Sequence, residues 1–80
     1  MQINTIIPLR NDWHVVPSGK LWKLREEHRA DHWGLYLTQA EAIGEGIAQA
    51  RLGATSLIIH GRDGRINRVW SYDDATIPYR

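Results

Sequence analysis

The chemically richest stretch of the sequence is residues 58–72, IIHGRDGRINRVWSY. Glycines beside arginines can form a phosphate-binding loop, in which a glycine-rich turn leads from a strand into a helix. Here a second β-rich segment follows Gly64, so the loop leads from one strand into another. We therefore interpret Asp63-Gly64 as the centre of a type I′ hairpin turn, which requires positive φ at both positions. This turn would pair Arg62 with Arg65.

The same turn predicts which residues face each other across the hairpin. It places Leu57 opposite Trp70 and Ile58 opposite Val69, where apolar side chains pack across the strand pair. The apolar run from Leu57 to Ile59 is typical of a central strand that is buried on both faces.

The histidines give little support for metal or catalytic chemistry. His28 and His32 lie four residues apart, a spacing that would place both on one face of a helix, as metal ligands can be. Their segment, EEHRADH, has neither a cap nor an apolar stripe, and a third ligand is not evident. His60 lies in the apolar strand, where a single histidine is usually a hydrogen-bonded core residue. The sequence has no cysteine, which excludes a thiol nucleophile and a cysteine-bound zinc, and no other nucleophile has an obvious base. We therefore expect no catalytic residue, no metal site and no cofactor.

Basic and aromatic side chains cluster on the two expected hairpins, which is a partial signal for nucleic-acid binding. The net charge of +1 gives no overall positive field, and nearby acidic residues dilute the local charge. Small size, aromatic surface and edge strands instead favour contacts with another protein. The candidate contact residues for either partner are Lys20, Trp22, Lys23, Arg62, Arg65, Arg68, Trp70 and Tyr72.

The elements that would position these residues fit one small domain, because 80 residues can form only one core. Asp12–Val16 is β-branched and aromatic, and residues 17–20, PSGK, provide a turn before a second strand that starts at Leu21. In this second strand Trp22 and Leu24 would share the core face, while the basic residues that alternate with them would face solvent.

A helix is predicted over residues 38–52, where apolar residues recur every three or four positions. Residues 35–37 form a third short strand or an extended lead into it. Thr38 and Glu41 have the spacing of a capping box at the start of the helix. Gly53 lies where a left-handed residue would end it.

Two glycines inside the predicted helix, Gly44 and Gly46, each weaken it by about 1 kcal/mol relative to alanine. Either one of them allows close approach to the sheet or to a partner, or both are simply tolerated small residues. The sequence leaves these two interpretations open.

The ends of the chain are less regular than its core at about residues 13–72. Residues 1–10 reach Pro8 after a weak alternation, which indicates a short N-terminal strand or arm, and residues 73–80 indicate an irregular C-terminal tail. No apolar run approaches the roughly 20 residues of a membrane span, and the first ten residues lack the features of a secretory signal. We therefore expect a cytoplasmic protein without membrane contacts.

Four segments together resemble a family of small bacterial and phage proteins, domain of unknown function 2188. They are HVVP at residues 14–17, TQAEAI at 38–43, IHGRDGRI at 59–66 and SY at 71–72. The resemblance covers roughly residues 13–72 and implies a ββαββ fold, but it implies no activity. The chain departs from the family pattern in the first turn, where Lys20 and Leu21 precede Trp22, and in its two terminal segments.

These observations predict one α+β domain with a four-stranded antiparallel sheet in ββαββ order, one helix on one face and a possible extra N-terminal strand. A domain of this size without disulfide or metal has little stability of its own, and pairing is a common remedy. We expect a non-catalytic binding module that forms a homodimer, or binds another protein, through the sheet or the N-terminal strand. A monomer whose terminal segments cover the spare face is the competing arrangement. Binding of single-stranded RNA or DNA is the alternative function.

Overall fold

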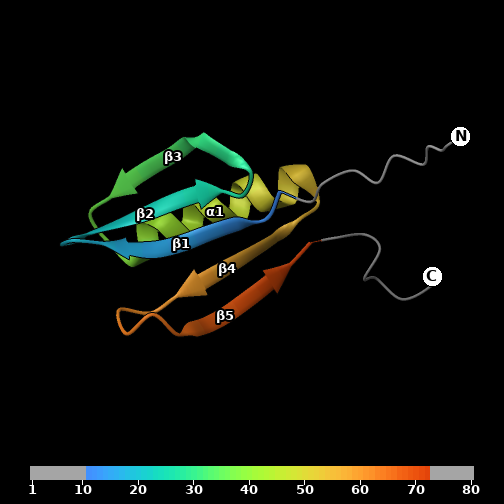
Figure 1. Cartoon of the computed structure of the whole chain (residues 1–80). Helices are drawn as coiled ribbons and strands as arrows, with labels where there is room; N and C mark the ends of the chain where they lie inside the picture. The colour runs from blue at the N-terminus through green and yellow to red at the C-terminus, as the bar shows by residue number, and fades with distance from the viewer. Residues whose placement is uncertain (1–10, 73–80) are drawn as a thin grey trace, which may run out of the picture.

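The computed structural model describes residues 11–72, in which one helix packs against one face of a five-stranded sheet (Figure 1). The strands are β1 (Trp13–Ser18), β2 (Leu21–Glu26), β3 (Arg29–Tyr36), β4 (Ser56–His60) and β5 (Ile66–Ser71), and the helix is α1 (Gln39–Gly53). The predicted α+β class with one helix is confirmed. The expected N-terminal strand and C-terminal tail lie outside the described residues.

The strand order is β3-β2-β1-β4-β5, and its middle pair, β1 and β4, is parallel. The other neighbouring pairs are antiparallel, so the prediction of a wholly antiparallel sheet is wrong. The cause is β3, which has eight residues where the sequence indicated a short strand or a lead. A third strand before α1 reverses the direction in which the chain enters the helix. The strand that follows α1, β4, therefore runs in the same direction as β1, as the arrows in Figure 1 show.

The loop between β4 and β5 differs from the predicted type I′ turn. The Gly64 amide donates to the Gly61 carbonyl over 2.9 Å, and the Gly61 amide donates to the Arg65 carbonyl over 2.7 Å. Arg62 and Asp63 are therefore the central residues of the turn, and Gly64 follows them with φ +85°. This is the three-residue hairpin loop in which a left-handed glycine forms a bulge. The Asp63 carboxylate stabilises it by accepting from the Arg65 amide over 3.0 Å, so Arg62 does not pair with Arg65.

Beyond this loop the hairpin has the predicted register. Leu57 faces Trp70 and Ile58 faces Val69, while a one-residue shift beside His60 absorbs the longer loop. The first hairpin is tighter. Gly19, with φ +61°, is the first of its two central residues, as a type II′ turn requires.

The start of α1 is fixed by the predicted capping box. The Glu41 amide donates to the Thr38 hydroxyl, and the Thr38 amide donates to the Glu41 carboxylate, each over 3.1 Å. The helix ends one residue later than predicted, at Gly53, and the left-handed residue is Ala54, with φ +55°. The reason is that the Ala54 amide still donates to Arg51, over 3.2 Å, so the last turn extends through Gly53.

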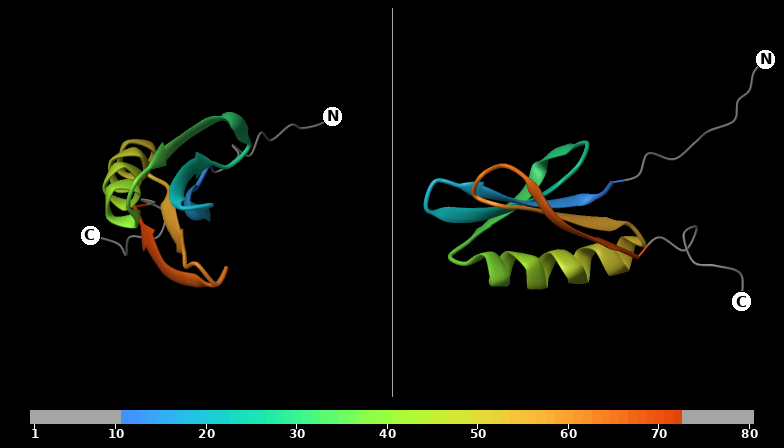
Figure 2. Two further views of the ribbon diagram at one scale, coloured as in Figure 1. Left: turned by 90° about the vertical axis from the view of Figure 1, so that its left-hand side faces the viewer. Right: turned by 90° about the horizontal axis from the view of Figure 1, so that it is seen from below.

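The core lies between α1 and one face of the sheet, whereas no described element covers the opposite face (Figure 2). Gly46 allows the close approach, because a Cβ there would lie 2.7 Å from Cδ1 of Leu57 and 3.0 Å from Cδ1 of Leu24. A Cβ at Gly44 would meet nothing within 4 Å. The structure thus assigns the close contact to Gly46. Within residues 11–72, no helix is long and apolar enough to cross a membrane. The buried apolar residues are Val15, Trp22, Leu24, Ala42, Ala50, Leu57 and Ile59.

Candidate binding surfaces

The sheet face that α1 leaves uncovered, here called the open face, is the first candidate surface. Since Leu24 and Leu57 point into the core and side chains alternate along a strand, their neighbours point to the open face. Trp33, Leu35 and Val69 expose 51%, 46% and 52% of their surface there. The register places on this face His14, Val16, Lys23, Arg25, Trp33, Leu35, Ile58, His60 and Val69.

Three hydrogen-bonded side chains occupy the middle of the open face. Nδ1 of His14 lies 2.9 Å from Nε2 of His60, and Nε2 of His14 lies 2.5 Å from the Glu27 carboxylate. With both rings neutral, His14 donates to Glu27 and accepts from His60. Burial lowers the pKa of His60, and the neighbouring His14 and Arg25 lower it further. His60 is hydrogen-bonded as expected, but it lies on the open face and not in the core.

A hollow of about 410 Å³, here called the basic hollow, lies where β2 and β3 meet the edge of the sheet. The Lys23 ammonium lies over the Trp33 ring, 4.7 Å from its centre. Glu26 is the single acidic residue of the lining, and its carboxylate is hydrogen-bonded to Nδ1 of His32 over 2.7 Å. The lysine and arginine side chains of the lining form no ion pair with a carboxylate of residues 11–72. The lining residues are Lys23, Arg25, Glu26, His28, Arg29, Ala30 and Trp33.

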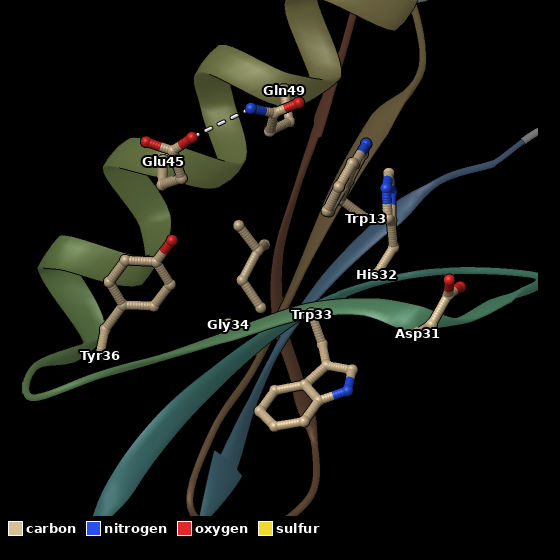
Figure 3. Close-up of a pocket in the computed structure, with 9 residues that line it drawn as sticks. Trp13, Asp31, His32, Trp33, Gly34, Tyr36, Glu45 and Gln49 are labelled. Atoms are coloured by element: carbon tan, nitrogen blue, oxygen red, sulfur yellow. Dashed lines mark hydrogen bonds between the residues drawn. The ribbon is translucent and has the colours of Figure 1, made fainter.

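A smaller hollow, of about 260 Å³, lies on the other side of β3, facing α1 (Figure 3). Figure 3 shows the Trp33 indole on the opposite side of the strand from Tyr36. Burial raises the pKa of Tyr36, and the nearby Glu45 carboxylate raises it further. The carboxylate of Glu45 accepts from Gln49 over 3.0 Å, and His32 is held by Glu26. Three polar side chains of its lining, His32, Glu45 and Gln49, thus already have partners within the domain.

The edge strand β5 is the third candidate surface, because within residues 11–72 it pairs only with β4 and all six of its residues are exposed. Ile66 exposes 60% and Trp70 38% of its surface. At the end of this ladder the Tyr72 amide donates to the Thr55 carbonyl over 2.9 Å. Hydrogen-bonded and non-hydrogen-bonded pairs alternate in antiparallel ladders. The Trp70 amide therefore points toward β4, and the Val69 amide points outward from the edge.

Comparison with known proteins places this fold in a family. The model of an uncharacterised protein family conserved in bacteria, DUF2188, matches residues 13–72, which include all five strands and the helix. The chain belongs to the DUF2188 family. No curated protein and no solved structure matches it. Membership accounts for the order of the segments and assigns no activity.

In this DUF2188 domain the predicted contact residues do not form one surface. Trp22 exposes only 8% of its surface, and the Arg62 guanidinium lies over its ring, 4.6 Å from the centre. Arg62 also donates to the Gly19 carbonyl over 2.5 Å, so it joins the tips of the two hairpins. Lys23 is the member of the set that lies on the open face.

The remaining predicted contacts lie elsewhere. Arg68 lies over the ring of Trp70, 5.1 Å from its centre, on the side of the sheet that carries α1. Tyr72 packs against the core. Lys20 and Arg65 are exposed at the two hairpin loops.

The basic hollow contains residues that the sequence did not single out. Trp33 lies opposite Arg25 because β3 pairs with β2 in antiparallel register, and Arg29 starts the same strand. An alternation of Trp33 and Leu35 with Gly34 could have indicated this strand. No local signal joins His14 to His60, which are 46 residues apart and meet only through the parallel pairing of β1 and β4.

The two histidines at helical spacing do not share a helix face. His28 lies in the β2–β3 turn with φ +63°, and His32 lies on β3. Among residues 11–72, no group of three or more His, Cys, Asp or Glu residues could hold a metal ion.

Proposed function

We propose that the domain is a non-catalytic cytoplasmic binding module that forms a homodimer by pairing the β5 strands of two copies. The observation that carries this proposal is the exposure of the whole edge strand, including Ile66, Val69 and Trp70. An exposed apolar edge strand is a template for pairing with another strand. The other edge strand, β3, is less suited because Arg29 and Asp31 place charges along it.

If the twofold axis of the dimer passes between the Val69 residues of the two copies, the paired β5 strands have a register in which no like charges face each other. Val69 of each copy would face Val69 of the other, and their outward amides and carbonyls would form a hydrogen-bonded pair. Arg68 of each copy would then face Trp70 of the other. This arrangement repeats between copies the cation–π contact that Arg68 and Trp70 make within one copy.

The open face is a weaker candidate for self-association. Two copies stacked face to face would bury the charges of Lys23 and Arg25, which form no ion pair within residues 11–72. Nucleic-acid binding by the eight predicted contact residues is also less favoured, because they lie on both sides of the sheet.

A single introduced cysteine tests the register, since the chain has none of its own. Two Cα atoms in a hydrogen-bonded antiparallel pair are about 5.5 Å apart, a distance that a disulfide spans. We expect mild oxidation of Val69→Cys to give a covalent dimer of twice 9.2 kDa in non-reducing electrophoresis. The matched control is Leu52→Cys on α1, which is 83% exposed and should remain mainly monomeric.

Light scattering of the full chain tests the dimer without a cross-link. We expect a mass of twice 9.2 kDa at micromolar concentration, and a monomer for Val69→Pro, which removes the outward amide and spares the hydrogen bonds to β4. A monomeric mass for the unmodified chain, with equal cross-linking of the two cysteine variants, would contradict the proposal.

A further inference from the structure

We propose that the basic hollow binds a nucleotide unit of single-stranded nucleic acid, with the base stacked on Trp33 and the phosphate held by the surrounding basic side chains. The hollow lies on β2 and β3, at the opposite end of the sheet from β5. Pairing through β5 would leave it open, so this site does not depend on the proposed dimer.

The charge of the hollow favours an anionic ligand. Lys23, Arg25 and Arg29 bring three positive charges together, and no carboxylate of residues 11–72 forms an ion pair with them. The one acidic side chain of the lining, Glu26, is engaged by His32. Basic side chains without acidic partners attract phosphates and release the counterions that phosphates carry. The positive charge is local, since the net charge of the chain is only +1.

Trp33 distinguishes a nucleotide from a simple anion. Half of its surface is exposed, and it lies directly opposite Arg25 in the sheet. The Lys23 ammonium, 4.7 Å from the ring centre, is held beside the indole by a cation–π contact. A base on the exposed part of the ring would bring its phosphate within reach of these cations. Aromatic platforms beside basic grooves bind single strands in this way, with little preference for sequence.

The size and position of the hollow fit one nucleotide of a longer strand. Its volume of about 410 Å³ lies within the range of small-ligand sites. Because β3 is an edge strand, nothing in residues 11–72 pairs with its outer side. A single strand of nucleic acid can therefore enter the hollow and continue past the edge of the sheet.

Two probes test whether the basic hollow binds nucleotides and whether its ligand is nucleic acid or a free nucleotide. They are an oligothymidylate of about eight nucleotides and thymidine monophosphate. Each is titrated into the full chain while tryptophan fluorescence and, for a labelled oligonucleotide, anisotropy are recorded. Three phosphate contacts predict that affinity for the oligonucleotide falls roughly 20-fold between about 50 and 200 mM salt, since each contact contributes about 0.7 to the logarithmic slope.

Matched variants locate the site, because each removes one positive charge or one indole. We expect Arg25→Gln and Arg29→Gln to weaken oligonucleotide binding several-fold and to reduce the salt dependence. Arg65→Gln, at an 86% exposed side chain in the other hairpin, should have little effect. Trp33→Leu should remove the fluorescence quenching, whereas Trp70→Leu should retain it.

Tighter binding of the oligonucleotide than of the mononucleotide supports a nucleic-acid site, whereas equal binding assigns the site to free nucleotides and contradicts the proposal of a nucleic-acid ligand. Three other results would overturn the proposal: no oligonucleotide binding up to about 100 µM at low salt, equal losses for Arg25→Gln and Arg65→Gln, or inorganic phosphate binding as tightly as thymidine monophosphate. Circular dichroism of each variant verifies that it is folded. None of these readouts depends on whether the chain dimerises.

Discussion

His60 is a histidine that the folded domain holds preferentially in its neutral form. Its ring is hydrogen-bonded to His14, which in turn contacts the Glu27 carboxylate. Burial is the main cause of its lowered pKa, and His14 and the Arg25 guanidinium add to the effect. A proton on His60 would be poorly solvated and would face a permanent cation, so the hydrogen-bonded pair depends on pH.

We expect the free energy of unfolding to fall as pH is lowered from about 7 to 5. The pKa of His60 in the folded state lies below its usual 6.5, so between these two values the unfolded chain binds more protons and stability increases with pH. The contribution is complete above pH 6.5 and is lost as pH decreases toward the folded-state pKa. Thermal unfolding of His60→Gln should show a weaker pH dependence.

The control for this prediction is His28→Asn. His28 is exposed and has φ +63°, a conformation that asparagine tolerates. It should keep the original pH dependence of the unfolding midpoint. If His60→Gln keeps it as well, His60 is not responsible for the loss of stability at low pH.

At the scale of elements, α1 contains two glycines with opposite surroundings. Gly46 faces the sheet, where Leu57 and Leu24 are almost fully buried and have little freedom to move away from an added methyl group. Gly44 is exposed, and a methyl group added there would have no neighbour within 4 Å. The same substitution at these two positions thus separates packing from helix propensity.

We expect Gly46→Ala to destabilise the domain by about 1–3 kcal/mol through overpacking, reduced somewhat by the gain in helix propensity. Gly44→Ala should stabilise it by roughly 0.5–1 kcal/mol, because alanine loses less conformational entropy in a helix. Denaturant unfolding of the two variants measures both effects. Equal stability of Gly46→Ala and Gly44→Ala would show that the helix does not approach the sheet as closely as described.

At the scale of the whole molecule, the proposed dimer would link stability to self-association. A small domain buries a modest share of its surface, so covering β5 in that dimer would add appreciably to its stability. The unfolding midpoint should then increase with protein concentration. A tenfold increase corresponds to about 0.7 kcal/mol per copy, or roughly 3–5 °C.

The variant Val69→Pro should abolish this concentration dependence, because it cannot form the central hydrogen bond between the two copies. Differential scanning calorimetry at several concentrations is the measurement. A midpoint of the unmodified chain that does not change with concentration would exclude a dimer that stabilises the fold.

The amino-acid sequence by itself determined the features that depend on neighbours along the chain. The capping box of Thr38 and Glu41, the turn glycines and the two faces of β2 follow from hydrogen bonds and alternation within a few residues. The predicted facing of Ile58 and Val69 is observed because a one-residue shift beside His60 compensates for the longer loop. The sequence did not determine the type of that loop, because moving one residue from the strand into the turn changes only local hydrogen bonds.

The tertiary structure decided which distant segments meet. The length of β3 depends on its pairing with β2, and β3 sets the direction of β4 and so the parallel contact with β1. That contact joins His14 to His60, and the β2–β3 pairing assembles Lys23, Arg25 and Trp33 into the basic hollow. These contacts are selected by the burial of one sheet face under α1, a free energy that belongs to the whole domain and to no single stretch of sequence.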